Sequence, residues 1–134
     1  MRVLALDYGR ARCGVAVCDP TETIVTPLEP VQRVATRRGL GRLRALVDEY
    51  DAEAVIVGLP LSLRGDDTQQ TVETREFAAA VAQKLGVPVV LHDERLTTRL
   101  AQRDPSRTAS EDSRAAAHLL EDWLARPERP GSPR

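Results

Sequence analysis

The chain has 134 residues, the size of one domain of roughly 100–150 residues, so a cofactor domain and a substrate domain cannot both fit. Hydrophobic residues make up 42% and charged residues 29%, which excludes a disordered or fibrous protein. The formal net charge of −1 gives no global sign of a nucleic-acid partner, because such domains usually have a pI above about 9.

Several kinds of site are excluded by what the sequence lacks. Lys84 is the only lysine and no Gly-Lys pair exists, which excludes a P-loop GTPase or ATPase. Four scattered aromatic residues are too few for a base-stacking platform. Cys13 and Cys18 are expected on opposite faces of one strand, about 16 Å apart, as buried thiols of a reducing compartment. Without an apolar run of roughly 18 residues, a cytoplasmic protein without membrane contact is expected.

The sequence of the first half of the chain predicts three strands and a helix. Residues 2–7 and 14–19 are short apolar runs bounded by Gly and Asp, typical of strands joined by a tight turn. Residues 24–34 are extended and contain two prolines, which predicts a strand at a sheet edge. Residues 36–50 have apolar side chains at three- and four-residue intervals, the pattern of an amphipathic helix.

The second half alternates strands and helices. Residues 54–58 are continuously apolar and predict a strand buried on both faces, and residues 89–91 predict a further buried strand. Between them, Val72, Phe77, Val81 and Leu85 mark a helix that ends at Gly86. A last helix is expected from about Asp112 to Ala125.

This order predicts an α/β fold with a five-stranded mixed sheet, in which the first three strands are antiparallel and helices cover both faces. Residues 1–125 are expected to form the domain. Residues 126–134, which contain three prolines, are expected to be a loose tail.

Three acidic residues lie where folding alone explains them poorly. Asp7 ends the first apolar run, where it could equally form a turn. Glu94 follows the last apolar run at a strand's carboxyl end, where ligands bind, but taken alone it is better explained as a surface residue. Asp112 is in the first turn of the last helix, where an acid also serves as a cap. Its phase nevertheless places it on the apolar stripe, a direction that capping does not require. The stripe consists of Ala116, Leu119, Leu120 and Trp123.

Two strand-end carboxylates and a third on a helix could converge above the sheet. Converging carboxylates repel one another unless a hard cation binds them, and Mg²⁺ or Mn²⁺ prefers oxygen ligands. The expected chemistry is metal-assisted attack on phosphate, with two ions about 3.5–4 Å apart that activate water and stabilise the leaving oxygen. The sequence contains no Gly-x-Ser-x-Gly motif, and His92 and His118 are interpreted as structural.

Several motifs occur in order along residues 2–125. They are Leu6-Asp7-Tyr8-Gly9-Arg10, Arg12-Cys13-Gly14-Val15-Ala16-Val17, Val57-Gly58-Leu59-Pro60-Leu61 with Gly65 behind it, Asp93-Glu94-Arg95-Leu96-Thr97-Thr98, and Asp112 before Ala115-Ala116. Together they resemble the YqgF (RuvX) family. The resemblance implies a ribonuclease H-like fold, similar to Holliday-junction resolvases of the RuvC type, and a nuclease that matures the precursor of 16S ribosomal RNA.

The resemblance also assigns residues. It implies that Asp7, Glu94 and Asp112 are the metal-binding, catalytic carboxylates. It further implies substrate-binding positions near the scissile phosphate and beside the catalytic acid, at Gly9, Arg10, Arg12, Arg95 and Thr97. Two departures are noted: related resolvases commonly have a fourth ligand where this chain has Ala115, and the segment between Thr98 and Asp112 is short.

Arginines are concentrated in two segments. Residues 32–47 contain five and no acid, and are interpreted as a solvated helix face. Residues 95–110 contain four arginines and one acid, with Arg95, Arg99, Arg103 and Arg107 at four-residue intervals, although Pro105 should interrupt a helix. Because this stripe begins beside Glu94, it is expected to contact phosphates, with Arg99 and Arg103 as further substrate-binding residues.

Several functions remain in competition. The first is a metal-dependent nuclease acting on structured or precursor ribosomal RNA, as a monomer or weak homodimer. The second is a junction resolvase acting on branched DNA, which would need a dimer. The third is a non-catalytic binding module for nucleic acid or the ribosome, as the missing fourth ligand permits. An actin-like or sugar-kinase ATPase, suggested by Asp7-Tyr8-Gly9, would need a second domain.

Overall fold

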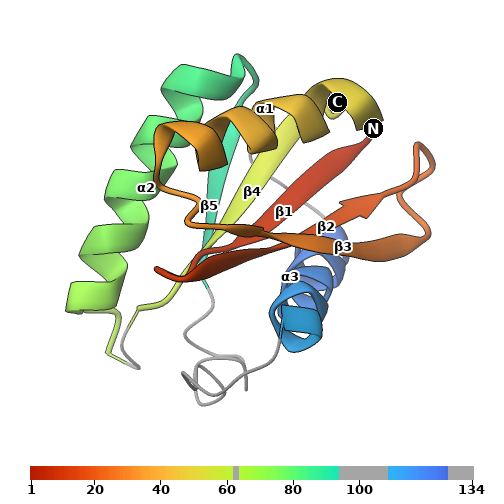
Figure 1. Cartoon of the computed structure of the whole chain (residues 1–134). Helices are drawn as coiled ribbons and strands as arrows, with labels where there is room; N and C mark the ends of the chain where they lie inside the picture. Colours follow the sequence, from red (N-terminus) through yellow and green to blue (C-terminus); the bar gives the residue numbers. More distant parts are fainter. Residues whose placement is uncertain (62–63, 94–108, 127–134) are drawn as a thin grey trace.

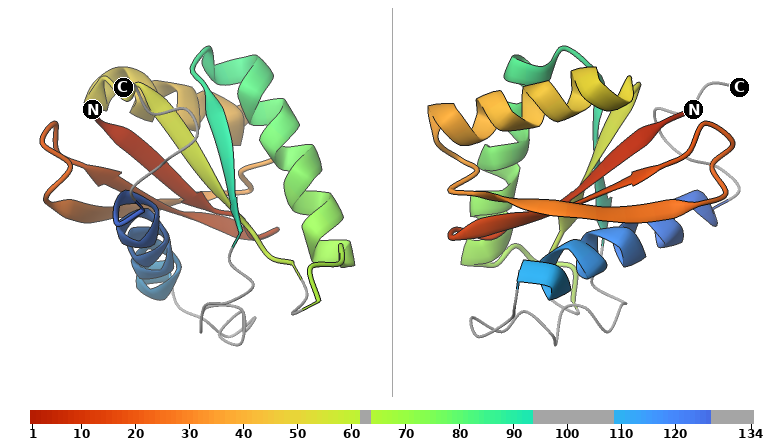
Figure 2. Two further views of the ribbon diagram at one scale, coloured as in Figure 1. Left: turned by 180° about the vertical axis from the view of Figure 1, so that it is seen from behind. Right: turned by 45° about the vertical axis from the view of Figure 1, so that its right-hand side comes forward.

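A five-stranded mixed sheet in the order β3-β2-β1-β4-β5 forms the centre of the fold, and helices cover both of its faces (Figures 1 and 2). The computed structural model describes residues 1–61, 64–93 and 109–126. The elements in chain order are β1 (Val3–Asp7), β2 (Arg12–Cys18), β3 (Val25–Gln32), α1 (Arg37–Tyr50), β4 (Ala54–Leu59), α2 (Gln69–Leu85), β5 (Val89–Asp93) and α3 (Ala109–Leu124).

Strand directions agree with the predicted topology. β1 pairs antiparallel with β2, and β2 pairs antiparallel with β3. On its other side β1 pairs parallel with β4, which pairs parallel with β5. The expected α/β fold, with three antiparallel strands followed by parallel ones and helices on both faces, is confirmed.

The two edges of the sheet differ in how well the sequence predicts them. β3 is an edge strand, as its two prolines suggested, because a proline cannot donate to a second neighbour. β5 is the other edge, and the prediction that residues 89–91 form a buried strand is wrong, because Val89 and Val90 are only partly buried. Its central Leu91 is 38% exposed. A short continuous apolar run therefore does not distinguish a central strand from an edge strand.

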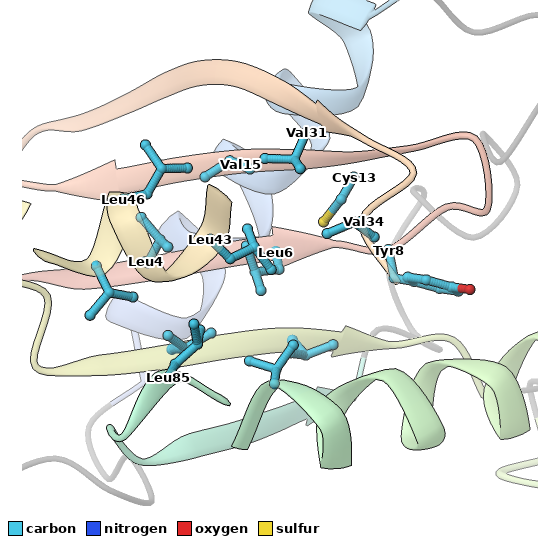
Figure 3. Packing of buried hydrophobic residues seen from close by; sticks show 14 of the residues in the cluster. Leu4, Leu6, Tyr8, Cys13, Val15, Val31, Val34, Leu43, Leu46 and Leu85 are labelled. Carbon is cyan, nitrogen blue, oxygen red and sulfur yellow. The ribbon is translucent and has the colours of Figure 1, made fainter. Parts of the chain in front are cut away.

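Alternating side chains divide the core into two layers. Leu4, Leu6 and the equivalent residues of β2 and β4 pack beneath α1 and α2, as Figure 3 shows around Leu43, Leu46 and Leu85. Val3, Ala5 and their neighbours face α3 instead. The residues of the second layer on α3 are Leu119, Leu120 and Trp123, with Ala116 beside them. The predicted apolar stripe of this helix is therefore the stripe that is buried.

Helix boundaries follow their caps. α1 starts after Thr36, whose Oγ1 accepts the N–H of Gly39 at 3.1 Å. α2 starts at Gln69, after a capping box between Thr68 and Thr71. The expected helix ending at Gly86 is confirmed. Of the four apolar residues that marked it, Phe77, Val81 and Leu85 are buried and Val72 is 46% exposed.

The last helix starts earlier than the sequence predicts. α3 begins at Ala109 rather than near Asp112 and ends at Leu124. Asp112 therefore lies inside the first turn, where the helix dipole favours an acid. The last eight residues of the expected tail lie outside the described residues.

The two cysteines occupy opposite layers of the core, as expected. Cys13 packs with the α1 and α2 layer and Cys18 with the α3 layer, and both are free thiols. Among the described residues, none of the helices combines the length and the hydrophobicity that a membrane span requires.

Candidate active site at the carboxyl edge of the sheet

Asp7 is the last residue of β1 and is 6% exposed. Because side chains alternate along a strand, it faces the same side as Val3 and Ala5, which pack against α3. The parallel strands β1, β4 and β5 have their carboxyl ends, at Asp7, Leu59 and Asp93, on the same side of the sheet, called here the carboxyl edge. In open α/β sheets the carboxyl edge is where ligands bind. A buried carboxylate at this edge is thus well placed for chemistry.

Gly14 of β2 brings the last helix against this edge. It is the register partner of Asp7, and the first turn of α3 lies directly on it. A Cβ atom added to Gly14 would be 1.9 Å from the carbonyl oxygen of Asp112. Only a residue without a side chain permits this approach. Asp7 and Asp112, which are far apart in the sequence, consequently flank the same glycine.

Two further contacts hold the start of α3 on β2. Arg12 donates from Nε to Oδ2 of Asp112 in an ion pair whose side chains are 28% and 15% exposed. The N–H of Val15 donates to Oγ of Ser113 at 3.3 Å, and Ser113 is 2% exposed. The inward direction predicted for Asp112 agrees with this arrangement. Arg12, expected to bind substrate, contacts a candidate metal ligand.

The turn between β1 and β2 contains Gly9 and Arg10, two of the predicted substrate-binding residues. Arg10 Nε donates to Oε2 of Glu73 in α2 at 3.0 Å. This hydrogen bond lowers the pKa of the Glu73 carboxyl and raises the pKa of Arg10. Next to it, Tyr8 stacks on Phe77 with 4.7 Å between ring centroids, and burial raises the pKa of its hydroxyl. The turn is therefore joined to α2, on the sheet face opposite α3.

Other candidate residues fall outside the described part of the chain. Glu94 follows β5 directly in the sequence, but its structure is not described, and the same holds for Arg95, Thr97, Arg99 and Arg103. Within residues 1–61, 64–93 and 109–126, no three His, Cys, Asp or Glu side chains form a group that could hold a metal ion. The described carboxylates of Asp7 and Asp112 supply oxygen donors, which fit a hard divalent cation rather than a soft one.

The histidines and Ala115 lie on other parts of the fold. His92 is 5% exposed, and its Nε2 lies 2.6 Å from Oδ2 of Asp122 in α3. His118 is exposed and pairs with Glu121 on the same helix. Ala115 is buried in α3, with 8% exposed. His92 thus connects β5 to α3, in keeping with its interpretation as structural.

Two contact residues were not predicted from the sequence. Ser113 follows Asp112, and a serine in a first helical turn is so often a cap that its buried contact with Val15 leaves no distinct pattern. Glu73 pairs with Arg10 across a separation of 63 residues. The helix α2 was predicted from its apolar residues alone, and nothing in the sequence around Glu73 indicates Arg10 as a partner.

Comparison with known proteins finds similarity over nearly the whole chain. A family model described as "RuvX: Holliday junction resolvase" matches residues 1–126. A protein of Maridesulfovibrio salexigens is 34% identical over 94% of this chain and 99% of its own length. One of Mycobacterium tuberculosis (strain ATCC 25177 / H37Ra) is 42% identical over 92% of this chain and 78% of its own. Both carry the name "Putative pre-16S rRNA nuclease".

Solved structures show the same fold. RuvC of T. thermophilus in complex with a Holliday junction substrate superposes with a TM-score of 0.59, covers 92% of this chain and 93% of its own, and is 18% identical. The fowlpox virus resolvase with its junction DNA has a TM-score of 0.52, with 10% identity over 94% of this chain and 100% of its own. The ribonuclease H-like fold expected from the sequence is thereby confirmed. The match along residues 1–126 and the relatives above 30% identity show that the chain belongs to the RuvX family.

Proposed function

We propose that this protein is a divalent-metal-dependent nuclease that hydrolyses phosphodiester bonds during processing of precursor 16S ribosomal RNA. The observation that carries the proposal is that Asp7 pairs with Gly14 within the sheet while Asp112 lies directly against that same glycine. Family membership supports a hydrolase of the nuclease class, and the names of the relatives point to ribosomal RNA as substrate.

In this proposal Asp7, Asp112 and Glu94 hold two Mg²⁺ or Mn²⁺ ions. Bound cations of this kind lower the pKa of water and stabilise a leaving oxygen. Asp7 contributes a carboxylate whose burial limits its motion. Asp112 is oriented by Arg12, which sets the direction of the carboxylate. Ala115 at the expected fourth-ligand position cannot ligate a metal, so these three carboxylates are the proposed ligands.

The substrate-binding residues are proposed in two groups. Gly9, Arg10 and Arg12 shape the β1–β2 turn beside the carboxylates. Arg10 and Arg12 already have acidic partners, so contact with a phosphate requires that they share or exchange these partners. Arg95, Thr97, Arg99 and Arg103 follow β5 in the sequence and are proposed to contact the phosphate backbone, which is the usual role of arginine at nucleic-acid surfaces.

Cleavage of branched DNA is the second candidate, because the matching family model is described as a Holliday junction resolvase. Symmetrical cutting of two strands needs two active sites related by a two-fold axis. A monomer or weak homodimer is proposed for this chain, which favours the RNA substrate. Sedimentation at increasing concentration distinguishes the two, since a stable dimer would favour the resolvase.

The decisive experiment incubates the purified protein with precursor 16S ribosomal RNA and with a four-way DNA junction, in Mg²⁺, in Mn²⁺ and in chelator. We expect metal-dependent cleavage of the RNA. Asp7→Asn, Glu94→Gln and Asp112→Asn should each reduce the rate at least about 100-fold, since even residues that only support a metal ligand typically cost about 10–100-fold.

The matched control is Glu111→Gln, which removes the neighbouring exposed acid from the same first turn of α3. It should keep its cleavage rate. Cleavage of neither substrate by the wild-type protein, or equal rates in folded Asp7→Asn and wild type, would show that the chain is a binding module instead. Faster cleavage of the junction than of the RNA would select the resolvase.

A further inference from the structure

A cavity of about 640 Å³ lies between the end of β3 and the start of α1, away from the candidate carboxylates. Three arginines line it: Arg33 after the strand, and Arg38 and Arg42 on successive turns of the helix. Its size is within the range of about 300–1,000 Å³ usual for ligand sites. The interpretation of residues 32–47 as a solvated helix face does not explain why these three arginines line one cavity.

The charge of this cavity is uncompensated within the described structure. From Pro30 to Val47 the sequence contains no acid, and the three guanidinium groups have no ion-pair partner among residues 1–61, 64–93 and 109–126. Like charges four residues apart on a helix, such as Arg38 and Arg42, repel one another. Farther along α1, Arg44 faces Asp48 at 3.8 Å at the same spacing. The guanidinium groups of the cavity are thus available to bind an external anion.

The backbone around the cavity is fixed by a tight turn. The N–H and Oγ1 of Thr36 donate to the carbonyl oxygen of Arg33 at 3.1 and 2.7 Å. A Cβ atom on Gly39 would be 2.4 Å from that same oxygen, so glycine is required for α1 to start here. The first turn of α1 contains no acid, which leaves the positive end of the helix dipole facing the cavity without a negative partner.

The cavity and the candidate active site are linked by the pairing of β2 with β3. Gln32, at the end of β3, is the register partner of Arg12, which contacts Asp112. The N–H of Arg33 donates to the carbonyl oxygen of Ala11 at 2.9 Å. Because α1 and α3 cover opposite faces of the sheet, a nucleic acid that reaches both the carboxylates and this cavity passes around the end of the sheet where β2 pairs with β3.

We propose that this arginine cavity binds phosphate groups of a double-stranded stretch of nucleic acid next to the cleavage point. The proposal rests on the nuclease function proposed above and adds a second contact surface to it. None of the residues that line the cavity is aromatic, so it offers no ring on which an unpaired base could stack, as single-strand sites do. Contacts limited to phosphates suit a duplex recognised by its shape and backbone.

The test measures binding separately from cleavage. In an Asp7→Asn background, fluorescence anisotropy follows the binding of a labelled RNA duplex, a DNA duplex of the same sequence and a single-stranded RNA over a range of salt concentrations. The variant carries Arg33→Gln, Arg38→Gln and Arg42→Gln together. The matched control is Arg44→Gln, on the same helix but outside the cavity. Thermal unfolding verifies that both are folded.

We expect the triple variant to bind duplex at least about tenfold more weakly, and its plot of log K against log salt to be shallower by about 2 to 3, since each lost phosphate contact removes about 0.9. Arg44→Gln should remain within about twofold of its parent. Either the RNA or the DNA duplex should bind the parent more tightly and show the larger loss of affinity in the triple variant. That duplex identifies the source of the phosphates.

The proposal is overturned if the triple variant keeps the parent's affinity and salt slope, if Arg44→Gln loses as much, if the loss is confined to single strands, or if the parent binds no duplex. Cleavage by the protein with Asp7 intact is measured in parallel. Loss of binding in the triple variant without any cleavage by wild type would reject the nuclease and keep the cavity. Cleavage by wild type together with unchanged binding in the triple variant would keep the nuclease and reject the cavity.

Discussion

Arg12 and Asp112 are 100 residues apart in the sequence and form an ion pair at the candidate active site. The guanidinium and a divalent cation would both be attracted to the same carboxylate. In the absence of metal, Arg12 therefore supplies the positive charge that keeps a partly buried carboxylate stable. This makes Arg12 a residue that positions Asp112, whatever contact it also makes with substrate.

We predict that Arg12→Gln lowers the free energy of unfolding by about 1 kcal/mol in chelator, a value typical of a partly exposed ion pair. The deficit should shrink in millimolar Mn²⁺, because an ion that binds only the folded state stabilises it and replaces the missing charge. Urea unfolding in the two conditions checks this. Arg10→Gln is the matched control: it breaks the pair with Glu73, so its deficit should not depend on metal. A metal-independent deficit in Arg12→Gln would contradict the shared-carboxylate idea.

Asp19 organises the hairpin between β2 and β3. Its Oδ1 accepts the backbone N–H groups of Thr23 and Ile24, each at 2.7 Å, and its Oδ2 accepts the hydroxyl of Thr21. These hydrogen bonds hold the pKa of the Asp19 carboxyl well below its ordinary value of 3.8. The folded state thus favours the ionised form, and the stabilisation is complete above about pH 5 and lost as the pH falls through the lowered pKa.

Asp19→Asn should accordingly reduce stability at neutral pH and differ progressively less from wild type as the solution is acidified below about pH 4. Chemical unfolding at pH 7 and pH 3 measures the two differences. Glu29→Gln, an exposed acid of β3, is the control without such backbone contacts. An Asp19→Asn deficit that is the same at both pH values would mean that the carboxylate charge does not stabilise the hairpin.

Among the elements, α3 depends most on a close approach. Its first turn lies on Gly14, and its buried stripe completes the core on that face of the sheet. Moving this turn outward would separate Asp112 from Asp7. The packing of one helix on one strand is therefore a condition for the proposed chemistry as well as for stability.

Gly14→Ala should destabilise the protein by about 1–3 kcal/mol, the usual cost of an overpacked core, and should reduce nuclease activity because α3 is displaced. Gly41→Ala is the matched change in α1, where a Cβ atom would meet nothing within 4 Å. It should stabilise the protein by about 0.5–1 kcal/mol, the ordinary advantage of alanine over glycine inside a helix. Differential scanning calorimetry measures the change in stability of both variants, and the cleavage assay measures their nuclease activity. Equal effects of the two changes would show that the contact with Asp112 imposes no constraint.

Charge on the whole molecule is separated although its sum is only −1. Residues 51–85, which include α2, contain six acids and three basic residues, whereas residues 32–47, which include most of α1, contain five arginines and no acid. A near-neutral total therefore coexists with a basic surface at the end of β3. The pI of a chain is a poor guide to nucleic-acid binding when opposite charges lie on different elements.

The two thiols report on cooperative unfolding of the whole fold. Cys13 and Cys18 are 0% and 1% exposed, in the two layers on either side of β2. Burial also raises the pKa of Cys18, which lowers its thiolate fraction. If the chain is one domain, Cys13→Ala and Cys18→Ala variants, each with one thiol left, should react with a disulfide reagent only through global unfolding. The two rates should then rise equally with denaturant. A thiol whose reaction does not depend on denaturant would reveal an independently opening layer.

Local patterns were sufficient to identify the order and type of the elements, the antiparallel opening of the sheet and the inward direction of Asp112. Strand alternation and helical period are properties of neighbouring residues, so they can be read without knowledge of the partners. They were insufficient for the edge position of β5, the start of α3 and the exposure of Val72, because coverage by other elements decides these.

The pairings at the candidate site required the folded arrangement. Neither Arg12 with Asp112 nor Arg10 with Glu73 leaves a mark on its own segment, since each contact exists only after strand order and helix placement bring distant residues together. The same holds for the arginine cavity, whose members look like an ordinary charged helix face until β3 is placed beside α1. The types of chemical group are thus a property of the chain, whereas their partners, burial and common cavity arise from packing across the sheet.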